Sequence, residues 1–97
     1  MPEFLERGRQ SGRTRDALAS LPDGAIYLVH DMKFADYCRG LLRSLGRNPN
    51  AISFATPSNF RRYEGARISA LGVDHAYWML ASGRKHEARD FLVVCVL

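Results

Sequence analysis

The segment Ala25-Ile-Tyr-Leu-Val-His30 is an almost continuous apolar run, with Gly24 before it and Asp31 after it. Apolar runs without strict alternation are typical of strands that are buried on both faces of a sheet. Three further segments have the same character: residues 51–56, 68–73 and 91–97. We therefore expect these four segments to be strands, and we expect Phe4-Leu5 to end a fifth.

The residues that follow His30 predict the clearest helix of the chain, from Met32 to Leu45. Asp31 is expected to be its N-cap and Gly46 its C-terminal stop. Six side chains with helical spacing form one apolar face of this helix: Phe34, Tyr37, Cys38, Leu41, Leu42 and Leu45. Shorter helices are expected at residues 14–21, 58–64 and 76–87.

Strands and helices thus alternate along the chain, and parallel strands need crossover connections that place helices on the sheet faces. The sequence predicts a three-layer α/β fold, in which a mostly parallel sheet of four to five strands has helices on both faces. Residues 1–97 are expected to form a single domain. Ligands of such sheets bind at the carboxyl ends of the strands. The residues expected at that edge are His30, Asp31, 56–58, Asp74, His75 and the turn around Gly12.

The composition agrees with one globular domain, because 46% of the 97 residues are hydrophobic and 25% are charged. These values exclude the disordered and collagen-like classes. The chain has two cysteines and no basic segment followed by an apolar leader, so we expect a cytoplasmic protein without a disulfide framework. No apolar run approaches the roughly 20 residues that span a bilayer.

The net charge is +4, and all cations except Lys33 and Lys85 are arginines. The arginine excess has two open explanations, which are contacts to phosphate groups and the base composition of the genome.

The stretch Gly8-Arg-Gln-Ser-Gly-Arg-Thr14 is a candidate phosphate loop, because it precedes a predicted helix. Glycines let successive backbone N–H groups turn toward an anion, a cation neutralises the outer phosphates, and a Ser or Thr hydroxyl holds Mg²⁺. The candidate cofactor-binding residues of this stretch are Gly8, Gln10, Ser11, Gly12, Arg13 and Thr14.

Two motifs of the chain resemble those of the P-loop NTPases of the terminase and helicase type, which have a RecA-like core. Arg9-Gln-Ser-Gly-Arg-Thr14 is similar to a Walker A motif, and Ala70-Leu-Gly-Val-Asp74 is similar to a Walker B strand. The resemblance implies that Asp74 pairs with Thr14, and that the two residues hold Mg²⁺ if ATP binds with magnesium. Small proteins encoded by bacteriophages look like the nearest relatives.

Three departures from the family pattern argue against efficient hydrolysis. Arg13 replaces the Walker A lysine, Arg7 replaces its leading glycine, and His75 stands where these motors usually carry a catalytic glutamate. A guanidinium binds phosphate but does not reproduce the compact charge of an ammonium group. Asp74 and His75 are therefore weak candidates for catalytic residues, with His75 as a substitute base.

A third group of residues combines aromatic and arginine side chains, which commonly anchor a protein partner or stack on single-stranded bases. The candidate partner-binding residues are Tyr63, Arg67, Tyr77 and Trp78, and the candidate nucleic-acid contacts are Arg61 and Arg62. We expect the apolar run at 91–97 to be a strand in the sheet interior or, alternatively, a strand that pairs with a second copy. The protein is expected to be a monomer or a homodimer.

The preferred functional hypothesis is a small phage-type protein that binds a host protein and modulates or inhibits it. Two alternatives remain open: a nucleotide-binding ATPase module and a nucleic-acid-binding accessory protein. The motif matches could also be accidental, which would leave a domain of unassigned function.

Overall fold

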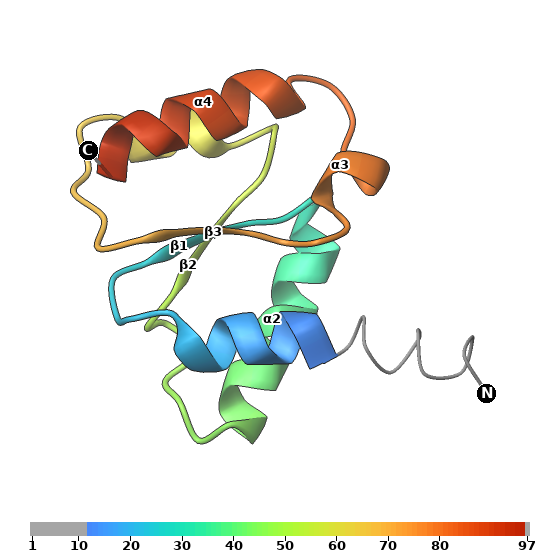
Figure 1. Cartoon of the computed structure of the whole chain (residues 1–97), viewed down its shortest axis with the longest axis vertical. Helices are drawn as coiled ribbons and strands as arrows, with labels where there is room; N and C mark the ends of the chain where they lie inside the picture. The colour runs from blue at the N-terminus through green and yellow to red at the C-terminus, as the bar shows by residue number, and fades with distance from the viewer. Residues whose placement is uncertain (1–11, 97) are drawn as a thin grey trace.

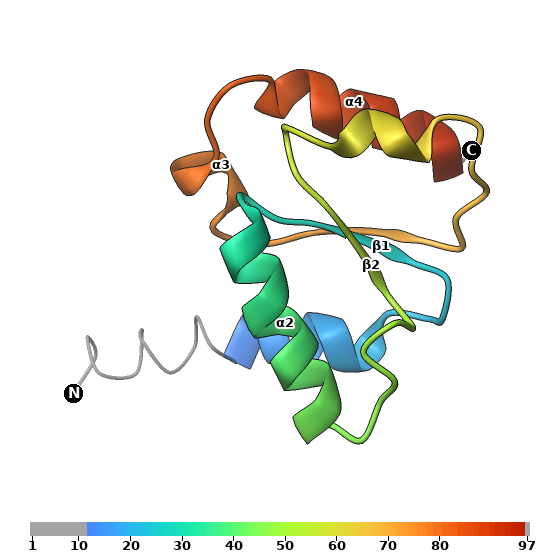
Figure 2. The same ribbon diagram turned by 180° about the vertical axis from the view of Figure 1, so that it is seen from behind.

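A small parallel sheet lies between two layers of helices (Figures 1 and 2). The structure is a computed structural model, and it describes residues 12–96. Residues 12–20 form the first described helix. The elements that follow in chain order are β1 (Ile26–Leu28), α2 (Met32–Ser44), β2 (Ser53–Ala55), the 3-10 helix η1 (Phe60–Tyr63), β3 (Leu71–Val73), α3 (Tyr77–Leu80) and α4 (Lys85–Val96).

The sheet has the strand order β2-β1-β3, with all neighbours parallel. The register places Tyr27 of β1 between Phe54 of β2 and Gly72 of β3. The expected strands at 25–30, 51–56 and 68–73 are thus present in shorter form. Within residues 12–96 the sheet has three strands rather than four or five, and Phe4-Leu5 lies outside the described residues.

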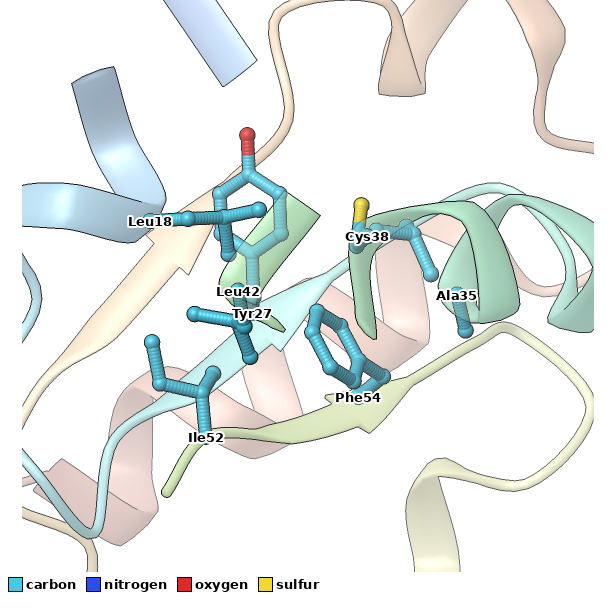
Figure 3. Close-up of a cluster of buried hydrophobic side chains, with 8 residues drawn as sticks. Leu18, Tyr27, Ala35, Cys38, Leu42, Ile52 and Phe54 are labelled. Atoms are coloured by element: carbon cyan, nitrogen blue, oxygen red, sulfur yellow. The ribbon is translucent and has the colours of Figure 1, made fainter. Parts of the chain in front are cut away.

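The central strand β1 sends alternate side chains to the two faces of the sheet, so each face has its own apolar core. On the face covered by α2 and the helix at 12–20, the buried residues are Leu18, Tyr27, Val29, Ala35, Cys38, Leu42, Ile52 and Phe54 (Figure 3). On the face covered by α4 and η1, they are Ile26, Leu28, Ala55, Phe60, Tyr77, Ala81, Ala88 and Leu92. The α/β architecture with helices on both faces is therefore present.

Helix α2 begins and ends where its local signals predict. The Asp31 carboxylate accepts a hydrogen bond of 2.8 Å from the Phe34 N–H, as an N-cap does. At the other end, Gly46 has a φ of +78°, which favours glycine. The Arg47 N–H reaches back to the Leu42 carbonyl at 2.9 Å, which satisfies a carbonyl of the last turn.

The expected strand at 91–97 is wrong, because residues through Val96 belong to α4. Phe91, Leu92, Val93 and Val94 favour strands by composition, but their packing follows a helical period. Ala88 and Leu92 are fully buried, and Phe91 packs against the same core. Val94 is 70% exposed, so this segment is not a covered interior strand. Tertiary packing of one helical face outweighs the strand propensity.

The expected helix at 76–87 is also wrong in extent. It is divided into the single turn α3 and the beginning of α4, and Gly83 between them has a φ of +74°. The expected helix at 58–64 is the 3-10 turn η1. None of the helices in residues 12–96 combines the length and the apolar character that a membrane-crossing segment needs.

Candidate functional site

A concave site lies at the carboxyl ends of β1 and β3. From β1 the chain passes to α2 on one face of the sheet, whereas from β3 it passes to α3 and α4 toward the other face (Figure 1). Neighbouring strands whose connections diverge in this way leave a crevice where ligands of parallel sheets bind. A pocket of about 670 Å³ is present there. Its lining consists of Arg13, Thr14, His30, Phe34, Tyr37, Asp74, His75, Ala76, Met79 and Leu80.

Asp74 is the polar centre of this site and is 1% exposed. Its Oδ1 accepts hydrogen bonds from the Thr14 hydroxyl at 2.9 Å and from the Tyr27 hydroxyl at 2.7 Å. Its Oδ2 accepts from the Ala76 N–H at 3.1 Å. Both oxygens of the buried carboxylate are therefore satisfied, as burial of such a group requires. The network ties β1, the end of β3 and the helix at 12–20 together.

Tyr27 reaches Asp74 because Gly72 leaves room for its ring. A Cβ atom at position 72 would lie 2.8 Å from Cδ1 of Tyr27 and 3.1 Å from Cδ1 of Leu21. The sequence reasoning missed both residues, since Tyr27 resembles any apolar strand residue and Gly72 resembles a neutral member of a Walker B strand. The signal that could have found them is a glycine in the middle of a short strand. Such a glycine often marks a place where another group packs closely against the backbone.

Burial raises the pKa of the Tyr27 hydroxyl far above its ordinary value, and its hydrogen bond to Asp74 raises it further. Burial also raises the pKa of the Cys38 thiol to about 12, with a second contribution from the Asp74 charge. Tyr27 therefore stays protonated and acts as a donor to Asp74. Cys38 stays a thiol and belongs to the core, as the sequence predicts.

Two histidines occupy corresponding positions beside the pocket, each two residues beyond the paired residues Leu28 and Val73. The Nδ1 atoms of His30 and His75 are buried, and they have no hydrogen-bond partner within residues 12–96. His75 Nδ1 lies 3.7 Å from Asp74 Oδ1, and His30 Nε2 lies 3.7 Å from Asp31 Oδ2. These distances exceed a hydrogen bond. The Nδ1 atom of each ring thus has unused hydrogen-bonding capacity in the interior beside the pocket.

Comparison of the chain with protein-family models, curated proteins and solved structures found no match. The resemblance to P-loop NTPases and the phage origin therefore stay predictions.

The structure brings Thr14 and Asp74 into direct contact, as the two motifs predict. Gly12, Arg13 and Thr14 belong to the helix at 12–20, whereas Gly8, Gln10 and Ser11 lie outside the described residues. Three protein groups donate hydrogen bonds to the Asp74 carboxylate, and a role of Thr14 and Asp74 in holding Mg²⁺ stays a prediction. Within residues 12–96, no group of three or more His, Cys, Asp or Glu side chains could hold a metal ion.

The four residues expected to bind a partner do not form one exposed surface. Tyr77 is fully buried, and its hydroxyl donates to the Lys85 carbonyl at 2.8 Å. Its pKa is raised to about 12 by burial. Tyr63 is half-buried and donates to the Phe54 carbonyl at 3.1 Å. Exposed Arg67 precedes β3, while Trp78, which is 40% exposed, follows it near the pocket.

The two arginines expected to contact nucleic acid lie together in η1 but differ in their contacts. Arg61 forms an ion pair with Glu87 and lies 5.3 Å from the centre of the Phe60 ring. Arg62 is exposed. The carboxylate of Glu87 also binds Arg84, so Arg61 and Arg84 share one negative charge.

Proposed function

We propose that the protein acts by binding a small organic anion in the pocket at the carboxyl ends of β1 and β3. The observation that carries this proposal is that one arginine and two histidines, Arg13, His30 and His75, line one pocket at this edge. Cations and histidines are the groups that recognise phosphate or carboxylate oxygens.

The proposal is supported by how the cation is held. Arg13 directly precedes Thr14, and the Thr14 hydroxyl is tied to buried Asp74. The backbone of Arg13 is therefore held at the pocket by the core of the fold. A fixed backbone leaves less of the chain to be ordered when a ligand binds, which favours affinity.

The size and walls of the pocket support a ligand with an apolar part. Its volume of about 670 Å³ lies within the range of small-molecule sites. Phe34, Met79 and Leu80 provide apolar surface beside the polar groups. Nucleotides, the ligands implied by the resemblance to P-loop proteins, are one member of this chemical class.

The test is titration calorimetry with phenyl phosphate as the anion and phenol as its neutral counterpart. We expect phenyl phosphate to bind, and Arg13→Gln to weaken binding about tenfold or more, because a hydrogen bond to a charged group contributes about 1.5–3 kcal/mol. Arg15→Gln is the matched control, since Arg15 is exposed on the same helix and does not line the pocket. Equal binding of phenol, or an Arg13→Gln variant that binds like the wild type, would overturn the proposal.

A protein partner, the preferred hypothesis from the sequence, is a second candidate. It is supported by the exposed apolar side chains of α3, where Met79 is 83% exposed and Leu80 is 58% exposed. Affinity capture from host lysate would test it by comparing the wild type with a Met79→Ser/Leu80→Ser variant. We expect one captured protein to be lost in this variant and kept in Val94→Ser, since Val94 is an exposed apolar residue of α4. Identical captured proteins would count against this candidate.

A further inference from the structure

One wall of the pocket is a row of three aromatic rings. The rings of His30 and Phe34 have centroids 4.9 Å apart and are inclined by 33°. Those of Phe34 and Tyr37 have centroids 5.6 Å apart and are inclined by 30°. All three residues line the pocket. The row runs from the end of β1 along the first two turns of α2, so rigid elements hold the rings in place.

The other wall comes from the segment after β3 and consists of Ala76, Met79 and Leu80. Met79 is the most exposed of the large apolar side chains in the described part of the chain. A thioether side chain is flexible and makes favourable contacts with aromatic rings. Tyr37, at the outer end of the row, is 49% exposed, so its ring is accessible to a ligand.

We propose that the anion recognised by this pocket carries a flat aromatic ring, which stacks on the row and is covered by Met79. The inference rests on the proposed function and specifies the apolar part of its ligand. The charged end lies at Arg13 and His75, and the ring lies between Tyr37 and Met79. A flat ring continues the arrangement of His30, Phe34 and Tyr37, whereas a puckered ring cannot stack on an aromatic face with the same contact.

The experiment compares phenyl phosphate with cyclohexyl phosphate, because the two esters have the same charge and differ in the flatness of the ring. Titration calorimetry of the wild type is expected to give about two- to tenfold tighter binding of the phenyl ester, the range measured for aromatic pairs beyond area burial. Tyr37→Leu is expected to weaken binding of phenyl phosphate more than that of cyclohexyl phosphate, and so to remove this preference. Met79→Ala is expected to weaken binding of the phenyl ester more than that of the cyclohexyl ester.

Trp78→Leu is the matched control, because Trp78 is an exposed aromatic residue next to Met79 that does not line the pocket. It should keep the full preference. Tyr37 and Met79 are exposed, so both variants are expected to fold, which circular dichroism can check. Equal affinity of the wild type for both esters overturns the ring inference and leaves the anion site intact. If neither ester binds, the proposed function is overturned as well.

Discussion

Gly72 makes the buried polar network possible at the scale of a single residue. It is paired with Tyr27 across the sheet, and its lack of a side chain lets the Tyr27 ring lie across β3 and reach Asp74. The glycine is needed here for space and not for an unusual φ. Any side chain at this position must push the tyrosine or Leu21 away.

Gly72→Ala is therefore expected to destabilise the fold by about 1–3 kcal/mol, the usual cost of adding a methyl group to a filled core. Gly40→Ala is the control: Gly40 lies within α2, and no atom lies within 4 Å of its added Cβ. That variant is expected to gain up to about 1 kcal/mol of stability from helix propensity. Urea unfolding of both variants measures the difference, and equal stabilities would contradict the role given to Gly72.

Arg47 is a second residue that joins separate parts of the fold. Its guanidinium donates to the Leu18 and Leu21 carbonyls at 2.6 and 2.7 Å, and it pairs with Asp23 at 2.6 Å. It thereby satisfies carbonyls at the end of the helix at 12–20. Arg47→Met keeps the aliphatic stem and is expected to cost about 1–3 kcal/mol. Arg43→Met, at an exposed position of the last turn of α2, should change the melting temperature much less.

At the scale of elements, α2 was predictable at both ends because its signals are local. The cap Asp31, the apolar spacing and Gly46 all lie within or beside the helix. The segment at 91–96 was not predictable in this way. Its β-branched residues favour a strand, and only contact with Phe60 and β3 shows that Ala88 and Leu92 form the buried side of a helix.

The helical packing of α4 predicts opposite outcomes for two apolar residues that lie two positions apart. Leu92→Ala is expected to cost about 2–5 kcal/mol, because Leu92 is fully buried. Val94→Ala should stay within about 0.5 kcal/mol of the wild type, because Val94 is 70% exposed. Chemical denaturation of the two variants provides the measurement. Similar costs at both positions would favour the strand over the helix.

The sequence predicted the polar residues of the candidate site, but it did not predict the aromatic and apolar residues that form the pocket walls. Thr14, Asp74, His30 and His75 were expected at the carboxyl edge, because the strand ends and motif spacing place them there. Phe34 and Tyr37 matched the pattern of a helix core face, and that pattern does not distinguish a core from a pocket wall. Tyr77 was a candidate partner-binding residue. The single turn α3 buries it and exposes Met79 instead.

At the scale of the whole molecule, two buried tyrosines and one buried cysteine of the described residues couple stability to alkaline pH. Burial raises the pKa of Tyr27, and it raises the pKa values of Cys38 and Tyr77 to about 12. The unfolded chain releases these protons at lower pH than the folded chain does. The free energy of unfolding is therefore unaffected at neutral pH and falls once the pH exceeds about 9 for the thiol and about 10 for the phenols.

Urea unfolding at pH 7, 9 and 10.5 tests this coupling, with an expected decline of up to about 1.4 kcal/mol per pH unit for each titrating group. Tyr77→Phe removes one of the three groups. It should be slightly less stable at pH 7, because the hydrogen bond to the Lys85 carbonyl is lost, and its stability should decline less steeply above pH 10. A free energy that is constant up to pH 10.5 would contradict the burial of these groups.

The central position of β1 has a consequence for the rate at which its backbone amides exchange with solvent deuterium. The Ile26 N–H donates to the carbonyl of Ala70 just before β3, and the Val29 N–H donates to the carbonyl of Ala55 in β2. Neither bond can break without separating β1 from a neighbour, so both amides should exchange only when the whole domain unfolds. The amides of the single turn α3 should exchange much earlier, by local fraying. Proton exchange followed by NMR would then report the global free energy of unfolding at β1 and the opening of one pocket wall at α3, from a single sample.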